Sequence, residues 1–318
     1  TRVAMKARFY IIIIFLLVCF SETNADSNLN VVVSIKPFHS LVSGVMLGVA
    51  RPELLLKGNF SPHTYSLKPS DAEKLQYADF VFWGGETLEG FLAKPINLLS
   101  KKAKVVSMLE IKGLKLKSFR AESHIGKSEN FESYSHNHSS DQDSELQSAV
   151  DPHIWLDTEN AKVITQKIVH ILSEFDPENA QKYQRNGEKF FVRINELDQQ
   201  LSSEMSEISD RTYLVLHDAY QYFESRYQLN SVGSITLQLE HFLSVSRLKK
   251  VQNMINTNKV RCIFTEPQYS QKLVKALIQG TSVKKGVLDP IGADILPGPE
   301  LYFDLLKNLS ISLRSCLN

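Results

Sequence analysis

The chain has 318 residues, with 36 Lys and Arg against 35 Asp and Glu, and a formal net charge of +1. This length is typical of about two domains. The balance of charges offers no electrostatic case for binding nucleic acid or an anionic membrane surface.

The N-terminal stretch has the pattern of a signal peptide. Lys6 and Arg8 precede an apolar run over residues 9–20, and a short stretch ending in Ala25 follows. The run is shorter than the roughly 20 apolar residues that a membrane-spanning helix needs. We therefore predict that residues 1–25 are a signal peptide cleaved near Ala25.

Two further details of this region concern its start and a possible lipid anchor. Residues 1–4, before Met5, are interpreted as an upstream extension of the reading frame. A lipid anchor on Cys19 is the alternative, but Val18 is bulky where a lipoprotein signal has a small residue. We expect an exported, soluble protein that begins at Asp26.

Strand-like and helical stretches alternate along the rest of the chain. The expected strands are 31–35, 53–56, 79–83, 104–108, 213–216, 230–237, 261–265 and 285–288. Helical patterns begin near Pro37, Ser70, Thr158 and Pro299. This rhythm predicts an α/β protein of two Rossmann-like parallel-sheet lobes, over residues 26–175 and 209–318.

Residues 176–208 form the expected connection between the lobes. Pro177 to Ile208 is one helical pattern, about 48 Å long at 1.5 Å per residue, and Asp176 before Pro177 is a good start signal. Apolar residues recur along it at helical spacing, so one face can lie across both lobes. A single rigid helix predicts small rather than large lobe movements.

The stretch from about 120 to 150 differs in composition from the rest of the chain. It is rich in Ser, Asp, Glu and Asn and contains His124, His136 and His138. Such composition predicts disorder within the first lobe. A secondary, weak metal-binding role for the three histidines and a plain solvated linker remain equal alternatives.

Two cysteines remain after removal of the signal peptide. Cys262 lies in a predicted strand and Cys316 near the C-terminus. Because disulfides persist in exported proteins, we predict that they pair, with about 4 kcal/mol of stabilisation in an entropic model. Two buried free thiols are the alternative.

Four separate segments offer metal ligands. His63 and His217 follow predicted strands, His153 precedes a predicted helix, and Asp289 follows the last strand. Neutral imidazole and carboxylate are ligands of zinc, and ligands of open parallel sheets bind beyond the carboxyl ends of the strands. We therefore predict one metal site in the cleft between the lobes, with two ligands from each lobe.

A secreted zinc hydrolase is the rival class, since three histidines with an open position also describe catalytic zinc. The sequence has no His-Glu-x-x-His motif, and local spacing places no general base beside the histidines. Asp218 and Glu266 are expected to orient a histidine or to pack the lobes.

Several motifs resemble those of a known family, the substrate-binding proteins of metal ABC importers (cluster A-I), and within it the periplasmic zinc-binding components. The motifs are Ser66-Leu67-Lys68-Pro69-Ser70-Asp71, His153-Ile154-Trp155-Leu156, His217-Asp218-Ala219-Tyr220, Thr265-Glu266-Pro267-Gln268, Gly280-Thr281-Ser282-Val283 and Leu288-Asp289-Pro290. The resemblance covers nearly the whole mature chain. It implies the two-lobe, rigid-helix fold and a non-enzymatic monomer that captures Zn²⁺ in the periplasm. Its partners would be an ABC permease and the cytoplasmic ATPase of that permease.

The resemblance also bears on the choice of metal. Manganese-binding members have Glu at the position of His217, and extra carboxylate suits manganese whereas imidazole suits zinc. Some members have Glu immediately before the first histidine, but here the residue is Pro62. This departure leaves Asp289 or a water as the fourth ligand. A manganese carrier of the same family and a metal-dependent adhesin are the alternatives, and the missing lipid anchor disfavours the adhesin.

Overall fold

The computed structural model describes residues 29–120, 150–236, 245–269 and 272–318. The predicted signal peptide and the three histidines of the 120–150 stretch, His124, His136 and His138, lie outside these ranges. Within them, no helix is both long enough and apolar enough to cross a membrane.

The first lobe is built on a parallel four-stranded sheet with the order β2-β1-β3-β4. Its strands are β1 (Val31–Val33), β2 (Glu53–Leu54), β3 (Phe80–Trp83) and β4 (Lys104–Ser107). Its helices are α2 (Lys36–Val45), α3 (Pro69–Tyr77), α4 (Gly90–Leu99), α5 (Thr158–Phe175) and the short 3-10 helices η1 (Met108–Glu110) and η3 (Ile154–Leu156). All three valines of β1 are buried, as expected for a parallel strand covered on both faces.

The second lobe repeats this arrangement in the parallel order β6-β5-β7-β8. Its strands are β5 (Tyr213–His217), β6 (Ser231–Thr236), β7 (Cys262–Thr265) and β8 (Lys284–Val287). Its helices are α7 (Gln221–Arg226), α8 (Val245–Thr257), α9 (Lys272–Ile278) and α10 (Leu301–Leu317). The predicted fold of two parallel-sheet α/β lobes is confirmed.

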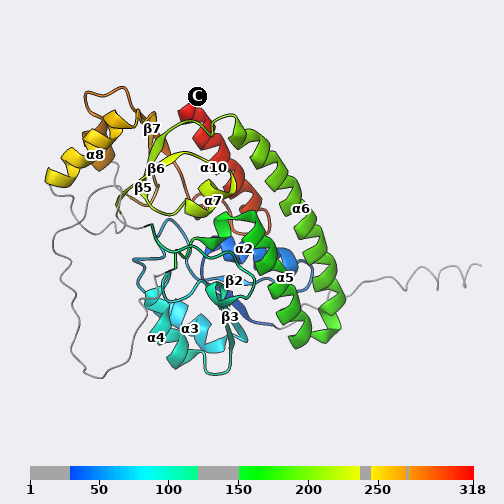
Figure 1. The fold of residues 1–318 in the computed structure, drawn as a ribbon. Helices are drawn as coiled ribbons and strands as arrows, with labels where there is room; N and C mark the ends of the chain where they lie inside the picture. The colour runs from blue at the N-terminus through cyan, green and yellow to red at the C-terminus, as the bar shows by residue number, and fades with distance from the viewer. Residues whose placement is uncertain (1–28, 121–149, 237–244, 270–271) are drawn as a thin grey trace, which may run out of the picture.

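Helix α6 (Ala180–Ser206) runs along one side of the molecule past both lobes (Figure 1). The helical pattern was expected to begin at Pro177, but Pro177–Asn179 form a separate 3-10 turn, η4. The α-helix itself has 27 residues, or about 40 Å. Gly187 lies where α6 packs against α5, and an added Cβ would be 2.4 Å from Cγ2 of Val169. Its small size permits the close approach of the two helices.

The two lobes share one apolar core rather than meeting only at a surface. Every residue of α2 is buried, and this helix packs against α5, α6 and α10. The same buried cluster contains Val33 of β1, Leu197 of α6, Val215 of β5 and Leu306 of α10. Separation of the lobes would therefore expose apolar surface, which favours a fixed arrangement.

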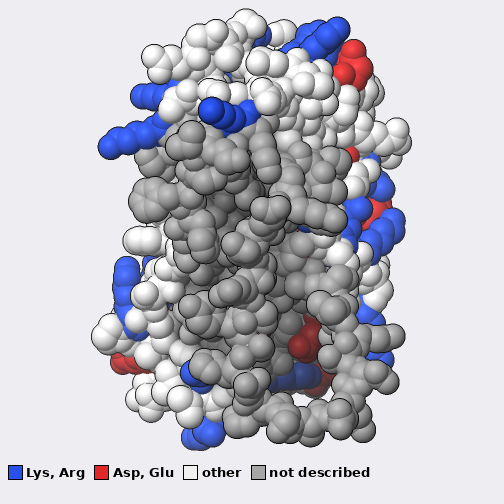
Figure 2. Space-filling view, turned by 60° about the vertical axis from the view of Figure 1, so that its left-hand side comes forward, with Lys and Arg blue, Asp and Glu red and all other residues white. Residues whose placement is uncertain are grey.

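A disulfide joins Cys262 and Cys316, with Cα atoms 6.0 Å apart. It attaches α10 to β7, and the prediction that these cysteines pair is confirmed. On the face drawn in Figure 2, basic side chains lie in separate small groups around the edge, with acidic side chains beside several of them.

Candidate metal centre

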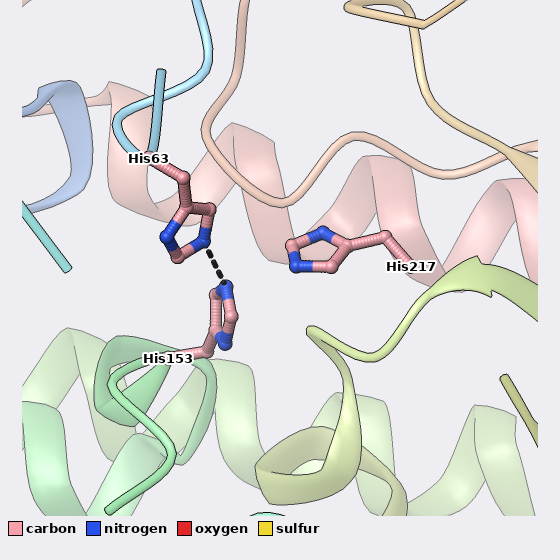
Figure 3. A group of neighbouring side chains, drawn as sticks. All are labelled: His63, His153 and His217. Carbon is pink, nitrogen blue, oxygen red and sulfur yellow. Dashed lines mark hydrogen bonds between the residues drawn. The ribbon is translucent and has the colours of Figure 1, made fainter. Parts of the chain in front are cut away.

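Three histidines from distant parts of the chain converge between the lobes. His63 lies in the turn region after β2, His153 immediately precedes η3, and His217 is the last residue of β5. One ring nitrogen of each lies within 4.8 Å of those of the other two. Figure 3 shows the rings facing one another, with Nε2 of His63 3.4 Å from Nε2 of His153. No other group of three or more His, Cys, Asp or Glu residues comes this close in the described ranges.

The histidine rings form a compact triangle. Their centroids lie 5.1 to 5.5 Å apart, and His153 and His217 are buried. His63 is exposed, although its ring faces the other two. Loss of water around the ring, together with the neighbouring His153 and His217, lowers the pKa of His63 to about 2. This imidazole is therefore neutral at physiological pH, as a metal ligand must be.

Asp151 determines the orientation of His153. Its Oδ1 accepts a hydrogen bond from Nδ1 of His153 at 2.7 Å and another from the His153 backbone N–H at 3.0 Å. A carboxylate only accepts, so Nδ1 carries the proton and Nε2 presents its lone pair to the centre. Burial alone would raise the pKa of Asp151, but its electrostatic interaction and hydrogen bonds with His153, together with the hydrogen bond from Gln221, hold it below its usual value.

Glu266 orients His217 in the same way. Its Oε1 accepts from Nδ1 of His217 at 3.0 Å and from the Tyr220 hydroxyl at 3.2 Å. Burial opposes a positive charge on His217, yet the nearby Glu266 carboxylate raises the pKa of this histidine above its usual value. The Nε2 atom of His217 is therefore also directed to the centre, and a proton competes with a metal more strongly here than at His63.

Asp289, expected with a water as the alternative to supply the fourth ligand, is not part of the group of three converging histidines. Its Oδ1 accepts from the backbone N–H groups of Ile291 and Gly292 at 3.1 and 3.0 Å, and its Oδ2 accepts from that of Ala293 at 2.5 Å. Gln268 adds a hydrogen bond to Oδ1 at 3.3 Å. Three of these four donors belong to the loop after β8, so most hydrogen bonds of the Asp289 carboxylate lie within its own loop.

A cavity of about 10 Å³ adjoins the three imidazoles. Besides the histidines, its walls are formed by Ser61, Pro62, Glu266, Gln268, Tyr269, Pro290 and Ile291. This volume is about that of a single water-sized sphere. The cavity therefore has room for about one water molecule beside the imidazoles.

The acidic residues near the site divide into two kinds. Glu266 orients a histidine, one of the two roles expected from the sequence, whereas Asp218 pairs with Arg120 at 2.9 Å. Arg120 also pairs with Glu224. Sequence reasoning did not assign Asp151 a role, although its position two residues before His153 was a usable signal. A short side chain can reach back to a ring at that spacing.

Two parallel-sheet lobes that share a core beside a long helix, with three imidazoles converging between them, are the features of a two-lobe solute-binding protein. The profile of the family described as "Zinc-uptake complex component A periplasmic" matches residues 31–316. The chain belongs to this family, which confirms the resemblance seen in the sequence.

Comparison with individual proteins agrees with this assignment. The high-affinity zinc uptake system protein ZnuA of Brucella suis biovar 1 (strain 1330) is 39% identical over 311 residues, covering 91% of this chain and 91% of that protein. A crystal structure of a ZnuA deletion mutant with bound zinc superposes with a TM-score of 0.74 at 22% identity, over 92% of this chain and 99% of that chain.

The fold also occurs with another metal. The Pseudomonas aeruginosa solute-binding protein FpvC in complex with Mn²⁺ gives a TM-score of 0.73 at 21% identity, over 91% of this chain and 99% of that chain. At such identities the likeness concerns the fold alone. The choice of metal must therefore be argued from the ligands.

Proposed function

We propose that this protein is the periplasmic component of a zinc uptake system and binds Zn²⁺ through Nε2 of His63, His153 and His217. The observation that carries the proposal is the convergence of three imidazoles, two of which are oriented by the buried carboxylates of Asp151 and Glu266. Three nitrogen donors suit zinc better than manganese, which prefers carboxylate and carbonyl oxygen. A water molecule in the adjoining cavity would complete a tetrahedral shell.

The same arrangement supports a role in zinc transport. His63 and His153 belong to the first lobe and His217 to the second, so a bound ion connects the lobes and stabilises their arrangement. We propose that the chain is exported with cleavage near Ala25, acts as a monomer, and delivers the ion to an ABC permease driven by a cytoplasmic ATPase. The family consists of transport components rather than enzymes, and the small volume of the cavity agrees with an ion as the cargo.

The test is a competitive titration of metal-stripped protein, residues 26–318, with Zn²⁺ and Mn²⁺ against a chromophoric chelator. We expect one tight zinc site and weak manganese binding. The variant His217→Glu should lose zinc affinity because it replaces an imidazole with a carboxylate. Comparable affinities for both metals, or no tight zinc site, would contradict the proposal.

A second variant tests whether the 120–150 stretch contributes to the tight zinc site. Deletion of residues 122–147 removes His124, His136 and His138 but none of the three converging histidines. We expect the tight zinc site to remain, with any loss limited to additional weak binding. A large loss of affinity at the tight site would show that the deleted stretch contributes to it.

A further inference from the structure

The loop of residues 289–295, between β8 and α10, forms one wall of the metal cavity through Pro290 and Ile291. The Asp289 carboxylate accepts hydrogen bonds from three consecutive backbone N–H groups in this loop, those of residues 291 to 293. The side chain of Asp289 therefore stabilises the loop from inside. The loop belongs to the second lobe, as does His217.

Lys36 binds the same loop from the first lobe. Its ammonium donates to the carbonyl oxygens of Gly292 at 2.9 Å, Ala293 at 2.5 Å and Ile295 at 3.0 Å. An ammonium has three N–H groups, so the loop uses the whole donor capacity of Lys36. The residue is only 5% exposed. Since a buried lysine is costly unless it is hydrogen-bonded, these three bonds hold the side chain and the loop together.

The position of Lys36 follows from local structure. Lys36 is the first residue of α2, directly after the turn that follows β1, and Pro37 occupies the first turn of the helix, where its fixed φ favours helix initiation. The lysine therefore lies at the carboxyl edge of the first sheet, on the side where the ligand of such a sheet binds. From there it reaches the second lobe without contacting the metal centre.

Trp155 provides a second attachment of the loop to the first lobe. Its Nε1 donates to the carbonyl oxygen of Pro290 at 2.7 Å, and its side chain is fully buried. Trp155 lies two residues after His153, and the two rings are in edge contact with centroids 5.4 Å apart. The loop is thus attached near its beginning by Trp155 and along its remainder by Lys36.

We propose that Lys36 is a positioning residue that holds the 289–295 loop against the metal site and thereby sets how long the ion stays bound. This inference depends on the proposed function, because it needs a metal at the three histidines. The wall formed by Pro290 and Ile291 can open for the ion only when the bonds of the loop to Lys36 and Trp155 break. Lys36 thus controls the rate of release without touching the ion.

A simple charge effect predicts the opposite result. Removal of a positive charge near a cation site lowers the repulsion of the ion, so it would slow dissociation. Loss of the attachment would speed dissociation. The sign of the change in Lys36→Met therefore separates the two explanations, since Met is similar in length but has no charge and no donor.

The experiment measures zinc dissociation by stopped flow, with zinc-loaded protein mixed into excess chelator. Lys36→Met is expected to release zinc at least about tenfold faster, because it removes three hydrogen bonds from a charged group to the loop. Asp289→Asn, which loosens the loop from inside while keeping its size, should also release zinc faster. This second variant keeps the test decisive where Lys36→Met folds poorly.

The matched control is Arg226→Gln. Arg226 of α7 binds Glu159 of α5 at 3.0 Å and Asp198 of α6 at 2.5 Å, so it also connects the lobes through a cation, but it contacts neither the loop nor the cavity. We expect this variant to lose stability and to keep its zinc dissociation rate within about twofold. Equal acceleration in the control and in Lys36→Met would overturn the inference.

The remaining outcomes separate this inference from the proposed function. Wild-type protein that binds zinc tightly, with Lys36→Met and Asp289→Asn releasing it at the wild-type rate or more slowly, would overturn the inference and leave the function intact. Wild-type protein without a tight zinc site would overturn both. Faster release in both variants but not in the control would support the proposal that Lys36 holds the 289–295 loop against the metal site.

Discussion

Replacement of Asp151 by Asn tests whether the buried carboxylates organise the metal centre. Asp151 accepts two hydrogen bonds from His153 and a third, through Oδ2, from Nε2 of Gln221 at 2.8 Å. An amide has one accepting end and one donating end. The amide introduced by Asp151→Asn would therefore either lose the bond to Nδ1 of His153 or turn its NH₂ group toward the NH₂ group of Gln221.

The expected loss of zinc affinity is about 10- to 100-fold, the usual effect of removing a group that orients a metal-binding histidine. This corresponds to about 1.4 to 2.7 kcal/mol of binding free energy. The proper control is Asp157→Asn, which makes the same chemical change nearby. Asp157 is the N-cap of α5 and accepts from the Glu159 backbone N–H at 2.8 Å, and Asn is an equally good N-cap.

The assay is competition for Zn²⁺ with a chromophoric chelator, after circular dichroism and thermal unfolding have shown that both variants fold. Asp157→Asn should bind zinc like the wild type. An Asp151→Asn protein that is folded and binds zinc within about twofold of wild type would refute the argument that this carboxylate orients His153.

Three further predictions concern stability, each measured as a free energy of unfolding in urea. Joint replacement of Cys262 and Cys316 by Ala removes a cross-link with a sequence separation of 54 and should cost about 4 kcal/mol; a cost below about 1 kcal/mol would contradict the entropic account. Gly187→Ala should destabilise the protein by about 1–3 kcal/mol, because the new Cβ would lie 2.4 Å from Cγ2 of Val169. Val169 cannot easily turn away, since a valine in a helix has one preferred rotamer. A gain in stability would show that α5 and α6 can move apart at this contact without cost. Burial raises the pKa of the fully buried Glu89 from 4.5 to about 7. The neutral carboxyl therefore stabilises the folded state below pH 4.5, and this contribution of about 3 kcal/mol is lost as the pH rises through 7. Stability curves of wild type and Glu89→Gln that stay parallel from pH 4.5 to about 8 would contradict this shift.

The strands were the most predictable elements of this protein. Val31 to Val33 and Tyr213 to Leu216 are apolar runs bounded by polar residues and turns, and a parallel strand covered on both faces produces this pattern. The start of the long helix was less exact, because Pro177 begins a 3-10 turn before the α-helix at Ala180. Both conformations share the same local start signal, so residue pattern alone does not separate them.

The candidate metal site was predictable in part. His63, His153 and His217 were recognised because imidazoles at the ends of parallel strands and at the start of a helix face one edge of the fold. Asp289 met the same criterion, yet its carboxylate turns into its own loop and binds the backbone N–H groups of residues 291 to 293. The direction of a short side chain depends on the loop conformation, which spacing in the sequence does not encode.

The sequence by itself determined the order of strands and helices, the two-lobe architecture, the pairing of the two cysteines and the three histidines of the candidate site. Each of these depends on local periodicity, on composition or on the presence of a residue type. Only the tertiary structure decided which groups orient the histidines, what Asp289 does and how Lys36 reaches the second lobe. Those contacts join residues as far apart as 259 positions. A hydrogen bond needs its donor and acceptor atoms about 3 Å apart. These contacts can therefore form only after the shared core has brought the two lobes together.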